Sequence, residues 1–459
     1  MKRKNKRWAK CLTASVTTAA LALRGLSPAN MTQKVFADGT ENKELAGTVS
    51  YADSANRVEA LLSGYTPKVI EFTDPHSGFT HPGVGVTKEI LENLQTQLRS
   101  GAEPWKSYFE TMLLDTWFSG KEVGPAYNGS VFKNSSLIAD SSRAYAQALM
   151  YFITGDNAYR RNAMKIIRAY KALDPETMDN GADYTDLRIH TGIPTNRMCI
   201  AAEILRYSTY EVTEGYTEDE LAWTEDDTEK FVSNFLCPIV ELFQFSPDYF
   251  MNQHLYTTIG GMSAYLFMDD AESYQKSVEW FMVNQNGRDQ GFNGSIKRLF
   301  REITTVDEVG KKEGSGTPLT QPVIQHVEMG RDQAHGCGDL TNSAILSRLM
   351  QGQGTKVDPV YGTVSDAPDA VDCFAFLDNR LVKAADFFFQ YMLGYDTEWV
   401  SVPFAIAPDG TIKDAYAAFA STYRGRYSTI NFWDFYTYYA CTQGITKEQI
   451  KEQYPYFYE

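Results

Sequence analysis

Three of the six histidines in this chain lie in short polar clusters whose residue types could do chemistry. The clusters are Asn252–His254, Gln325–Glu328 and Gly330–Gly336. The last one places a guanidinium (Arg331), an acid, an amide and an imidazole (His335) within five residues. A helical core does not need this mixture, because buried polar groups cost free energy unless they are hydrogen-bonded. The clusters therefore indicate a site that binds an anion and transfers protons, or else a self-satisfied polar network that braces a loop.

A fourth polar cluster, His190–Arg197, surrounds a proline. Pro194 forces a turn, and Asn196 and Arg197 then open a predicted helix. In one interpretation, Asn196 is simply the N-cap of that helix and has no further role. Alternatively, a helix N-terminus with an amide and a cation beside it is a good receiver for a carboxylate. Both interpretations stay open at this point.

Metal-binding and nucleophile motifs are missing from the sequence. There is no His-x-x-x-His or His-Glu-x-x-His spacing, and His326 and His335 stand nine residues apart without a clear third ligand. The cysteines after residue 37 show no Cys-x-x-Cys spacing, and Ser315 lacks the strand that precedes a nucleophile elbow. We therefore expect neither a metal nor another cofactor.

Helical periodicity dominates the chain from about Val86 onward, and it defines the elements that must position these clusters. The clearest stretch is Asp140–Lys171, in which Asp140 or Ser141 is the predicted N-cap and Thr154–Asn157 breaks the helix. This pattern predicts a helix hairpin. Further predicted helices are Arg197–Tyr207, Asp227–Phe245, Leu255–Phe267, Ala271–Asn284, Leu340–Met350 and Leu377–Leu393.

Helix pairs with short links, and few strand-like runs, favour an all-α fold: an α/α solenoid or an incomplete barrel of helix hairpins, the α/α toroid. Three segments lack a helical period, namely Asp38–Val86, Thr304–Pro322 and Gln351–Ala370. Long loops of this kind are often binding loops or lids. No linker separates independent halves, so we predict a single domain.

The first 37 residues resemble an export signal. Six basic side chains precede residue 11, a short apolar stretch follows, and cleavage is plausible after Ala37. Cleavage there would remove eight basic residues and no acidic ones, which would take the net charge from −15 to −23. Such a protein is a poor partner for nucleic acid. We expect a secreted or cell-surface protein, without a membrane span after cleavage, that holds a local basic pocket for an anionic substrate.

Several motifs, taken in order, are similar to those of the alginate-lyase-type α/α-toroid polysaccharide lyases. They are His81-Pro82-Gly83-Val84, Pro104-Trp105, the hairpin with Thr154-Gly155-Asp156, Asn252-Gln253-His254, Glu328–His335 and Leu377–Leu381. The resemblance runs from about His81 and implies a catalytic toroid at 81–459, which leaves an extended segment at 38–80 after the predicted signal peptide at 1–37. It also implies cleavage of a uronic-acid polysaccharide, such as alginate, glucuronan or a glycosaminoglycan-like polymer, by β-elimination.

This reaction requires three chemical roles. The C5 proton of a uronate is too weakly acidic to remove until the adjacent carboxylate is neutralised, and one well-placed donor contributes about 3–4 kcal/mol to that neutralisation. A base takes the C5 proton, and an acid protonates the departing O4 oxygen. The resemblance gives the neutralising role to Asn196 and His254, assisted by Arg331.

The proton-transfer residue departs from the family pattern. A tyrosine normally precedes the Gly-Arg-Asp-Gln element, whereas this chain has His326 there. His326 could replace the tyrosine as the base, because its ordinary pKa near 6.5 suits neutral pH. Tyr256, two residues after His254, is the alternative. The remaining candidates would bind substrate: Arg197, Asn252, Gln333, His335, Trp105 and Tyr127.

Two other functions fit the residues less well. A glycoside hydrolase on a similar toroid would need two carboxyl groups on opposite faces of the scissile bond. Glu328 and Asp332 lie only four residues apart on one segment, so they could hardly flank a sugar. A non-catalytic glycan-binding protein would use the polar clusters only to hold the fold together.

Overall fold

The computed structural model describes residues 58–129, 132–174, 177–178, 190–243, 251–284, 294–426 and 433–459. The chain divides into two compact units. The first unit comprises the described residues of Asn30–Phe243 together with Ser263–Ala271, and the second those of Gln244–Met262 together with Glu272–Glu459. The predicted signal peptide at 1–37 and the first part of the predicted extended segment, 38–57, lie outside the described residues.

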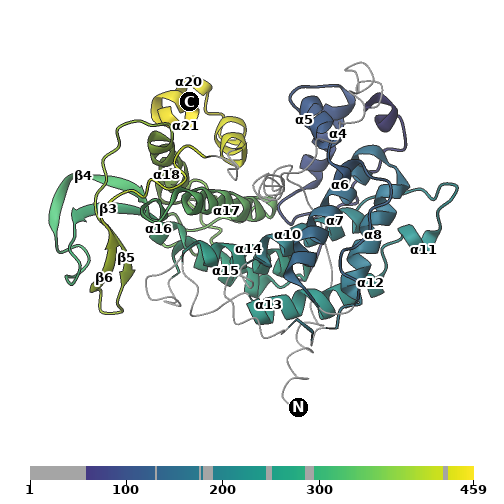
Figure 1. The fold of residues 1–459 in the computed structure, drawn as a ribbon, viewed down its shortest axis with the longest axis horizontal. Helices are drawn as coiled ribbons and strands as arrows, with labels where there is room; N and C mark the ends of the chain where they lie inside the picture. Colours follow the sequence, from purple (N-terminus) through teal and green to yellow (C-terminus); the bar gives the residue numbers. More distant parts are fainter. Residues whose placement is uncertain are drawn as a thin grey trace, which may run out of the picture. The chain divides into compact units, whose positions relative to one another are not determined.

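Helices make up most of the first unit (Figure 1), as the periodicity predicts. Its elements are β1 (Phe72–Thr73), β2 (Thr80–His81), α4 (Lys88–Arg99), α5 (Trp105–Met112), α6 (Thr116–Ser119), α7 (Asn134–Thr154), α8 (Asn157–Lys171), α10 (Gly192–Arg206), α11 (Glu218–Leu221), α12 (Glu225–Phe231), the π-helix Val232–Leu236 and α13 (Cys237–Phe243). The strands β1 and β2 form a short antiparallel pair.

The predicted helix hairpin is confirmed as α7 and α8. Gly155 ends α7 in the left-handed conformation with φ 72°, and Asp156 caps α8 by accepting a hydrogen bond from the Ala158 N–H. The predicted N-cap of α7 is wrong, because the helix begins at Asn134. Asp140 lies inside the helix, fully buried, and its carboxylate accepts hydrogen bonds from backbone N–H groups of the preceding loop.

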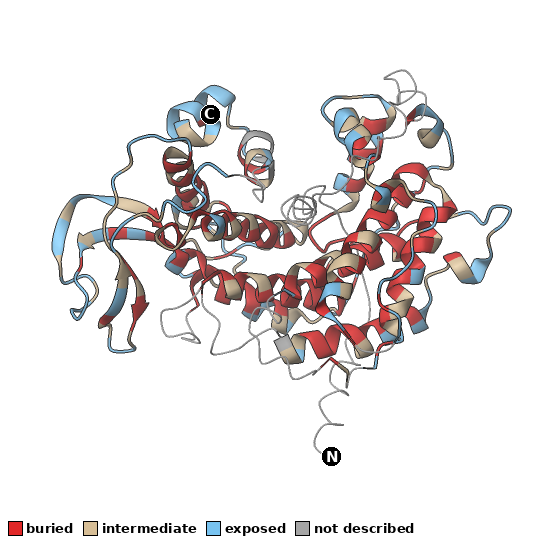
Figure 2. Ribbon diagram, viewed as in Figure 1, coloured by how far each residue is buried: buried red, intermediate tan, exposed pale blue. Residues whose placement is uncertain are grey.

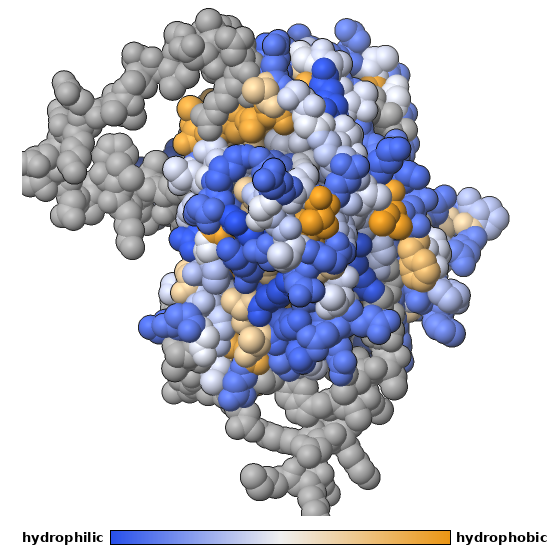
Figure 3. Space-filling view, turned by 90° about the vertical axis from the view of Figure 1, so that its right-hand side faces the viewer, coloured by the Kyte–Doolittle hydropathy of each residue, from blue (hydrophilic) through white to orange (hydrophobic). Residues whose placement is uncertain are grey.

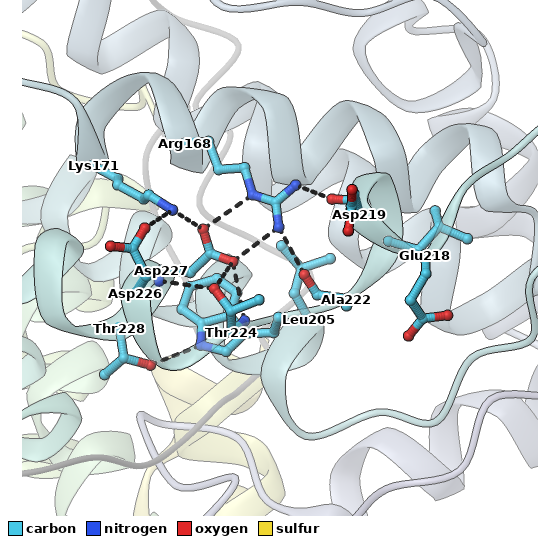
Figure 4. A network of polar contacts seen from close by, with 12 residues as sticks. Arg168, Lys171, Leu205, Glu218, Asp219, Ala222, Thr224, Asp226, Asp227 and Thr228 are labelled. Atoms are coloured by element: carbon cyan, nitrogen blue, oxygen red, sulfur yellow. Dashed lines mark hydrogen bonds and ion pairs between the residues drawn. The ribbon is translucent and has the colours of Figure 1, made fainter.

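A polar network ties the end of α8 to the start of α12 (Figure 4). Arg168 donates through two nitrogens to the Asp227 carboxylate at 3.0 and 2.9 Å, and Lys171 contacts the same carboxylate at 2.7 Å. Burial pushes the pKa of Asp227 upward, but these donors and the Thr224 backbone outweigh it and lower the pKa to about 2. This network therefore joins two helices and needs no functional explanation.

Hydrophilic residues dominate the side of the molecule where α8 and α11 lie, and hydrophobic residues occur there in separate patches (Figure 3). Exposed apolar residues of the first unit are Ile70, Phe72, Ile90, Tyr108, Leu114 and Val212. Scattered apolar residues are normal on a protein surface.

The second unit combines helices with two β-hairpins. Its elements are α14 (Asn252–Phe267, whose residues from Ser263 belong to the first unit), α15 (Ala271–Val283), α16 (Ile296–Leu299), β3 (Phe300–Val306), β4 (Thr317–His326), the 3₁₀-helix η3 (Val327–Gly330), α17 (Gln333–Gly352), α18 (Phe376–Met392), β5 (Val402–Ile406), β6 (Ile412–Tyr416), α19 (Trp433–Tyr436), the π-helix Thr437–Thr442, α20 (Lys447–Gln453) and α21 (Pro455–Tyr458).

Buried side chains line the long helices of both units (Figure 2). The helices predicted by periodicity are confirmed with changes: the predicted Asp227–Phe245 helix consists of α12, the π-helix and α13 as far as Phe243. Leu377, Asp378 and Asn379, predicted as helical, have left-handed backbone angles, with φ of 48°, 56° and 60°. The ends of other helices are shifted, since α17 begins at Gln333 and α10 at Gly192. Asn196 is therefore an interior residue of α10 and not its N-cap. In the part of the chain that the structure describes, no helix is both long and apolar enough to cross a membrane. The toroid arrangement and the single domain stay predictions.

The segment Thr304–Pro322, predicted as a loop, includes parts of both strands of an antiparallel hairpin. Phe300 pairs with His326, and the register shifts between Ile303 and Thr305. The exposed arms of these strands carry few alternating apolar residues, so a period-2 pattern is absent from the sequence. The hairpin matters because β4 ends at His326 and delivers the chain directly to the polar residues that follow.

Candidate functional site

The polar residues after β4 are positioned by a short 3₁₀-helix and the start of α17. Asp332 is the N-cap of α17, where its Oδ1 accepts a hydrogen bond from the His335 N–H at 2.9 Å. Its Oδ2 lies 2.5 Å from Nδ1 of the same histidine. The capping carboxylate thus fixes the His335 ring, whose side chain remains 34% exposed.

Glu328 is the centre of the buried part of the site. The Asn252 backbone N–H donates to Oε2 at 3.0 Å, and the Asn252 amide donates to both carboxylate oxygens at 2.9 and 2.8 Å. Arg331 donates through Nη1 to Oε1 at 3.0 Å. Glu328 is fully buried, whereas the Arg331 side chain is 31% exposed. A buried carboxylate therefore anchors a guanidinium that still reaches the surface.

Asp339, on α17, connects Glu328 to His326. His326 Nε2 lies 2.6 Å from Asp339 Oδ2, and both side chains are fully buried. Burial, the charge of Asp339 and a hydrogen bond with Asp339 together raise the pKa of Glu328 to about 8. Burial also raises the pKa of Asp339. Two buried carboxyl groups in contact cannot both ionise readily, so at least one of them is protonated near neutral pH.

His326 lies in the interior. Its ring contacts the rings of Phe300 and Phe388, with centroids 4.7 and 6.2 Å apart, and none of its surface is exposed. Burial lowers its pKa to about 3, although the charge of Glu328 acts in the opposite direction. The imidazole is therefore neutral at physiological pH.

Two further candidates lie near the start of α14. The His254 side chain is buried with its ring edge-on to Trp280, at a centroid distance of 4.8 Å. Tyr256 is half-buried, and its hydroxyl faces α17, since a Cβ added at Gly338 would lie 3.7 Å from that oxygen. Burial raises the pKa of Tyr256 and the charges of Asp339 and Glu328 raise it further, against the effect of the Asn342 side chain. The phenol is therefore protonated at neutral pH.

Gln333 is fully buried and braces the site. Its amide donates to the carbonyls of Met329 and Ala420 at 2.9 and 2.5 Å, and its backbone N–H donates to the carbonyl of Thr422 at 3.1 Å. These bonds attach the segment after β6 to the start of α17. Gln333 thus directs its amide N–H groups to the backbone, and the geometry favours a bracing role over the predicted contact with substrate.

The remaining predicted site residues belong to the first unit. The Asn196 amide donates to Ser263 Oγ at 2.9 Å, and Arg197 donates to Ser142 Oγ at 2.9 Å. Burial lowers the pKa of Arg197 to about 10. Tyr127 is buried against Tyr170, with centroids 5.2 Å apart, and Trp105 is half-buried at the first position of α5. Each of these side chains is therefore at least partly buried in its own unit.

His81, part of the motif that supports the resemblance, is fully buried in the first unit. Its Nε2 lies 3.0 Å from Asp269 Oδ1, and its Nδ1 lies 3.8 Å from Glu203. Burial lowers the pKa of His81 and raises that of Glu203. This cluster joins β2 to α10 and is buried too deeply to contact a polymer.

Sequence reasoning missed two residues of the site. Asp339 is a buried acid on α17, whose other inward-facing residues are mostly apolar or small. An acidic residue among them could have indicated a functional position in the sequence. Tyr416, at the end of β6, lies close enough to Glu328 and Arg331 to be influenced by both charges. Burial raises its pKa to about 12, Glu328 contributes to the rise, and Arg331 opposes it. No pattern around Tyr416 pointed to this position.

Among the described residues, no group of three or more His, Cys, Asp or Glu side chains could hold a metal ion. Comparison with protein families finds no family model that matches this chain, and comparison with curated proteins finds no match either. Any chemistry proposed for the second unit therefore rests on its own residues.

Proposed function

We propose that this protein is a polysaccharide lyase that cleaves a uronic-acid-containing polymer by β-elimination. The observation that carries the proposal is the Arg331 guanidinium, which is anchored on the buried Glu328 carboxylate and remains partly exposed beside His335. A cation held in this way is suited to neutralise a sugar carboxylate, which is the step that makes the C5 proton removable.

Other polar groups near Arg331 have complementary roles in the proposal. Asn252 and Arg331 both hold the Glu328 carboxylate, so the guanidinium is fixed before substrate arrives. His335, oriented by Asp332, binds a neighbouring sugar acid. His254 keeps the neutralising role that the resemblance implies. Arranging donors in advance lowers the reorganisation needed when charge develops in the transition state.

We assign proton transfer to Tyr256. Of the two predicted bases, Tyr256 is half-buried, whereas His326 is fully enclosed and contacts Asp339. A base must reach the proton that it removes, so the less buried of the two side chains, Tyr256, is favoured. Because burial raises the pKa of Tyr256, its phenolate form is scarce at neutral pH, and turnover should increase as the pH rises.

The carboxyl groups of the site argue against hydrolysis. Glu328 and Asp339 hydrogen-bond to each other inside the protein. The two carboxyl groups of a glycosidase flank the scissile bond at a separation of about 5 Å or more, with the sugar between them. No sugar fits between two carboxyl groups in contact, so this pair orients other side chains. We also propose that residues 1–37 direct export and that the helix pairs form an α/α toroid.

The proposal is tested by offering the protein a panel of polymers: alginate, glucuronan, heparosan, hyaluronan and pectate, with dextran as a neutral control. Elimination creates a conjugated double bond, so we expect ultraviolet absorbance to rise with at least one uronate polymer and not with dextran. New reducing ends without that absorbance would indicate hydrolysis. No cleavage of any uronate polymer would reject the proposed function.

A further inference from the structure

The turn formed by residues 421–426 is fastened to the start of the proposed catalytic segment. The Thr422 carbonyl accepts a hydrogen bond from the Gln333 N–H at 3.1 Å, and the Arg426 carbonyl lies 3.7 Å from Cys337 Sγ. Just before the turn, Ala420 donates to the Met329 carbonyl at 3.0 Å. The turn is therefore held beside the segment that carries Arg331 and His335.

Tyr423, within this turn, has a strained backbone and an exposed ring. Its φ is 66°, in the left-handed region that side chains rarely adopt, and 46% of the residue is exposed. A non-glycine residue in this conformation costs on the order of 1–2 kcal/mol. Burial of the ring does not offset this cost, because nearly half of the residue faces solvent. Tyr423 is therefore an exposed aromatic residue on a strained backbone.

Two arginines accompany this ring. The Arg426 guanidinium lies over Tyr423 at 5.3 Å, and the Arg424 guanidinium lies over Tyr391 at 4.0 Å with its Nε donating to the Tyr391 carbonyl at 2.9 Å. Both arginines are exposed. Within the described ranges, neither has a carboxylate partner, although the chain has 58 acidic and 43 basic residues. Exposed, unpaired cations in an acidic protein indicate an anionic ligand.

A stack of aromatic rings contacts the turn through Arg424. Tyr391 and Phe419 are parallel, with centroids 4.1 Å apart, and Trp399 packs against Phe419 at 4.5 Å. Arg424 lies on the Tyr391 ring of this stack. The position of the Arg424 guanidinium is therefore set by aromatic packing as well as by a hydrogen bond to backbone, which reduces the entropy lost when a ligand binds.

We propose that residues 421–426 form a binding subsite for a sugar acid, in which the Tyr423 ring packs on the C–H face of the sugar and Arg424 and Arg426 pair with carboxylates. The identification of the ligand as a unit of the substrate polymer rests on the proposed function. An aromatic face next to paired guanidinium groups matches the two surfaces of a uronate, which are an apolar ring face and a charged edge.

The test measures binding directly by affinity electrophoresis in gels that contain sodium alginate, pectate or dextran. Tyr423→Gly removes the ring and relieves the left-handed strain, so the variant should fold at least as stably as wild type. We expect its affinity for at least one acidic polymer to fall about three- to ten-fold, the size of an exposed aromatic and cation contact. The affinity of Arg426→Gln for the same polymer should fall by a similar factor. Dextran should retard none of the proteins.

Matched controls are Tyr458→Ala and Lys451→Gln. Tyr458 is also exposed, at 43%, and the Lys451 ammonium lies over its ring at 5.6 Å, so this pair has the same chemistry but belongs to α20 and α21 instead of the turn. These variants should bind as wild type does. Unchanged affinity of Tyr423→Gly and Arg426→Gln, or no binding of acidic polymer by wild type, would overturn the subsite. Selective loss of binding without any elimination activity would retain the subsite and reject the proposed function.

Discussion

At the scale of single residues, the main feature of the second unit is a buried glutamate with two opposing influences. The Asn252 amide and Arg331 hydrogen-bond to the Glu328 carboxylate and favour its charged form. Burial and the neighbouring Asp339 favour the neutral form and prevail, since they raise the pKa of Glu328 to about 8. At least one proton on this pair keeps the net buried charge low while leaving an acceptor for the guanidinium.

This balance makes stability depend on pH. Below the ordinary glutamate value, the folded and unfolded chains both hold the proton; between that value of 4.5 and about 8, only the folded chain does. The contribution of Glu328 to the free energy of unfolding is therefore lost as pH rises towards about 8. We expect the Tm of wild type to fall between about pH 5 and pH 8 more steeply than that of Glu328→Gln.

Glutamine is a suitable replacement because it is neutral, and its amide N–H can still donate to Asp339. The control is Glu302→Gln on β3, where the glutamate is about half exposed at 49% and contacts Arg380 at 3.4 Å. This control should keep the wild-type dependence of Tm on pH. Parallel Tm profiles for wild type and Glu328→Gln would show that Glu328 does not hold the proton.

The role of Tyr256 in proton transfer can be tested by removing its hydroxyl group. Tyr256→Phe removes one oxygen and keeps the ring, so the protein should fold and should lose turnover by at least about 10²-fold, the size of a general acid–base contribution. Tyr361→Phe, at a tyrosine of the same unit that is 65% exposed, is the control and should leave turnover unchanged. Full activity in Tyr256→Phe would move proton transfer to another residue, with His335 the next to test.

Residues that are close in sequence could be predicted, and residues that meet only in the fold could not. Arg331 and His335 lie on one short segment, and each pairs with an acid of that same segment, Glu328 and Asp332 respectively. Asp339 belongs to the site because its side chain on α17 contacts His326. Tyr416 belongs to the site although it lies on the β5–β6 hairpin. The choice between His326 and Tyr256 depended on burial, which a spacing pattern does not report.

At the scale of elements, the site depends on a close approach between η3 and β6. A Cβ added to Gly330 would lie 2.3 Å from the Tyr416 Cβ, a distance that real atoms do not reach. Glycine is therefore required here for space and not for its backbone conformation. The absence of a side chain lets the Tyr416 phenol approach Glu328 and Arg331 closely enough for their charges to affect its pKa.

A pair of glycine substitutions tests this packing. Gly330→Ala should lower the free energy of unfolding by about 2 kcal/mol, because β6 must shift to relieve the overlap. In Gly338→Ala the new methyl group would meet only the Tyr256 hydroxyl, at 3.7 Å, and alanine favours a helix. That variant should be as stable as wild type or more so. Equal denaturant midpoints for the two variants would contradict the proposed contact between η3 and β6.

Helices could be predicted because their apolar residues repeat with the helical period over many turns. The α7–α8 hairpin was recognisable from its periodic residues and from the break at Gly155–Asp156. Helix ends were less predictable, since Lys133 precedes α7 without a side-chain cap and no residue marks that start. The β3–β4 hairpin was missed because its outer residues are exposed on both faces and show no alternation.

At the scale of the whole molecule, the charge balance constrains the function. The chain carries a net charge of −15, so an anionic polymer is repelled by most of the protein. Arg331 and the two arginines of the 421–426 turn belong to segments that are hydrogen-bonded to each other, and they provide a local positive field in the second unit. A basic pocket for an anionic polymer on this acidic protein stays a prediction.

Elimination and hydrolysis of the polymer give products of different mass. For the polymer that the protein cuts, we expect each cleavage to give one fragment that is lighter by one water molecule than the corresponding hydrolysis fragment. Mass spectrometry of the products measures this difference without relying on absorbance. Fragments that all carry the full mass of hydrolysis products would contradict the account.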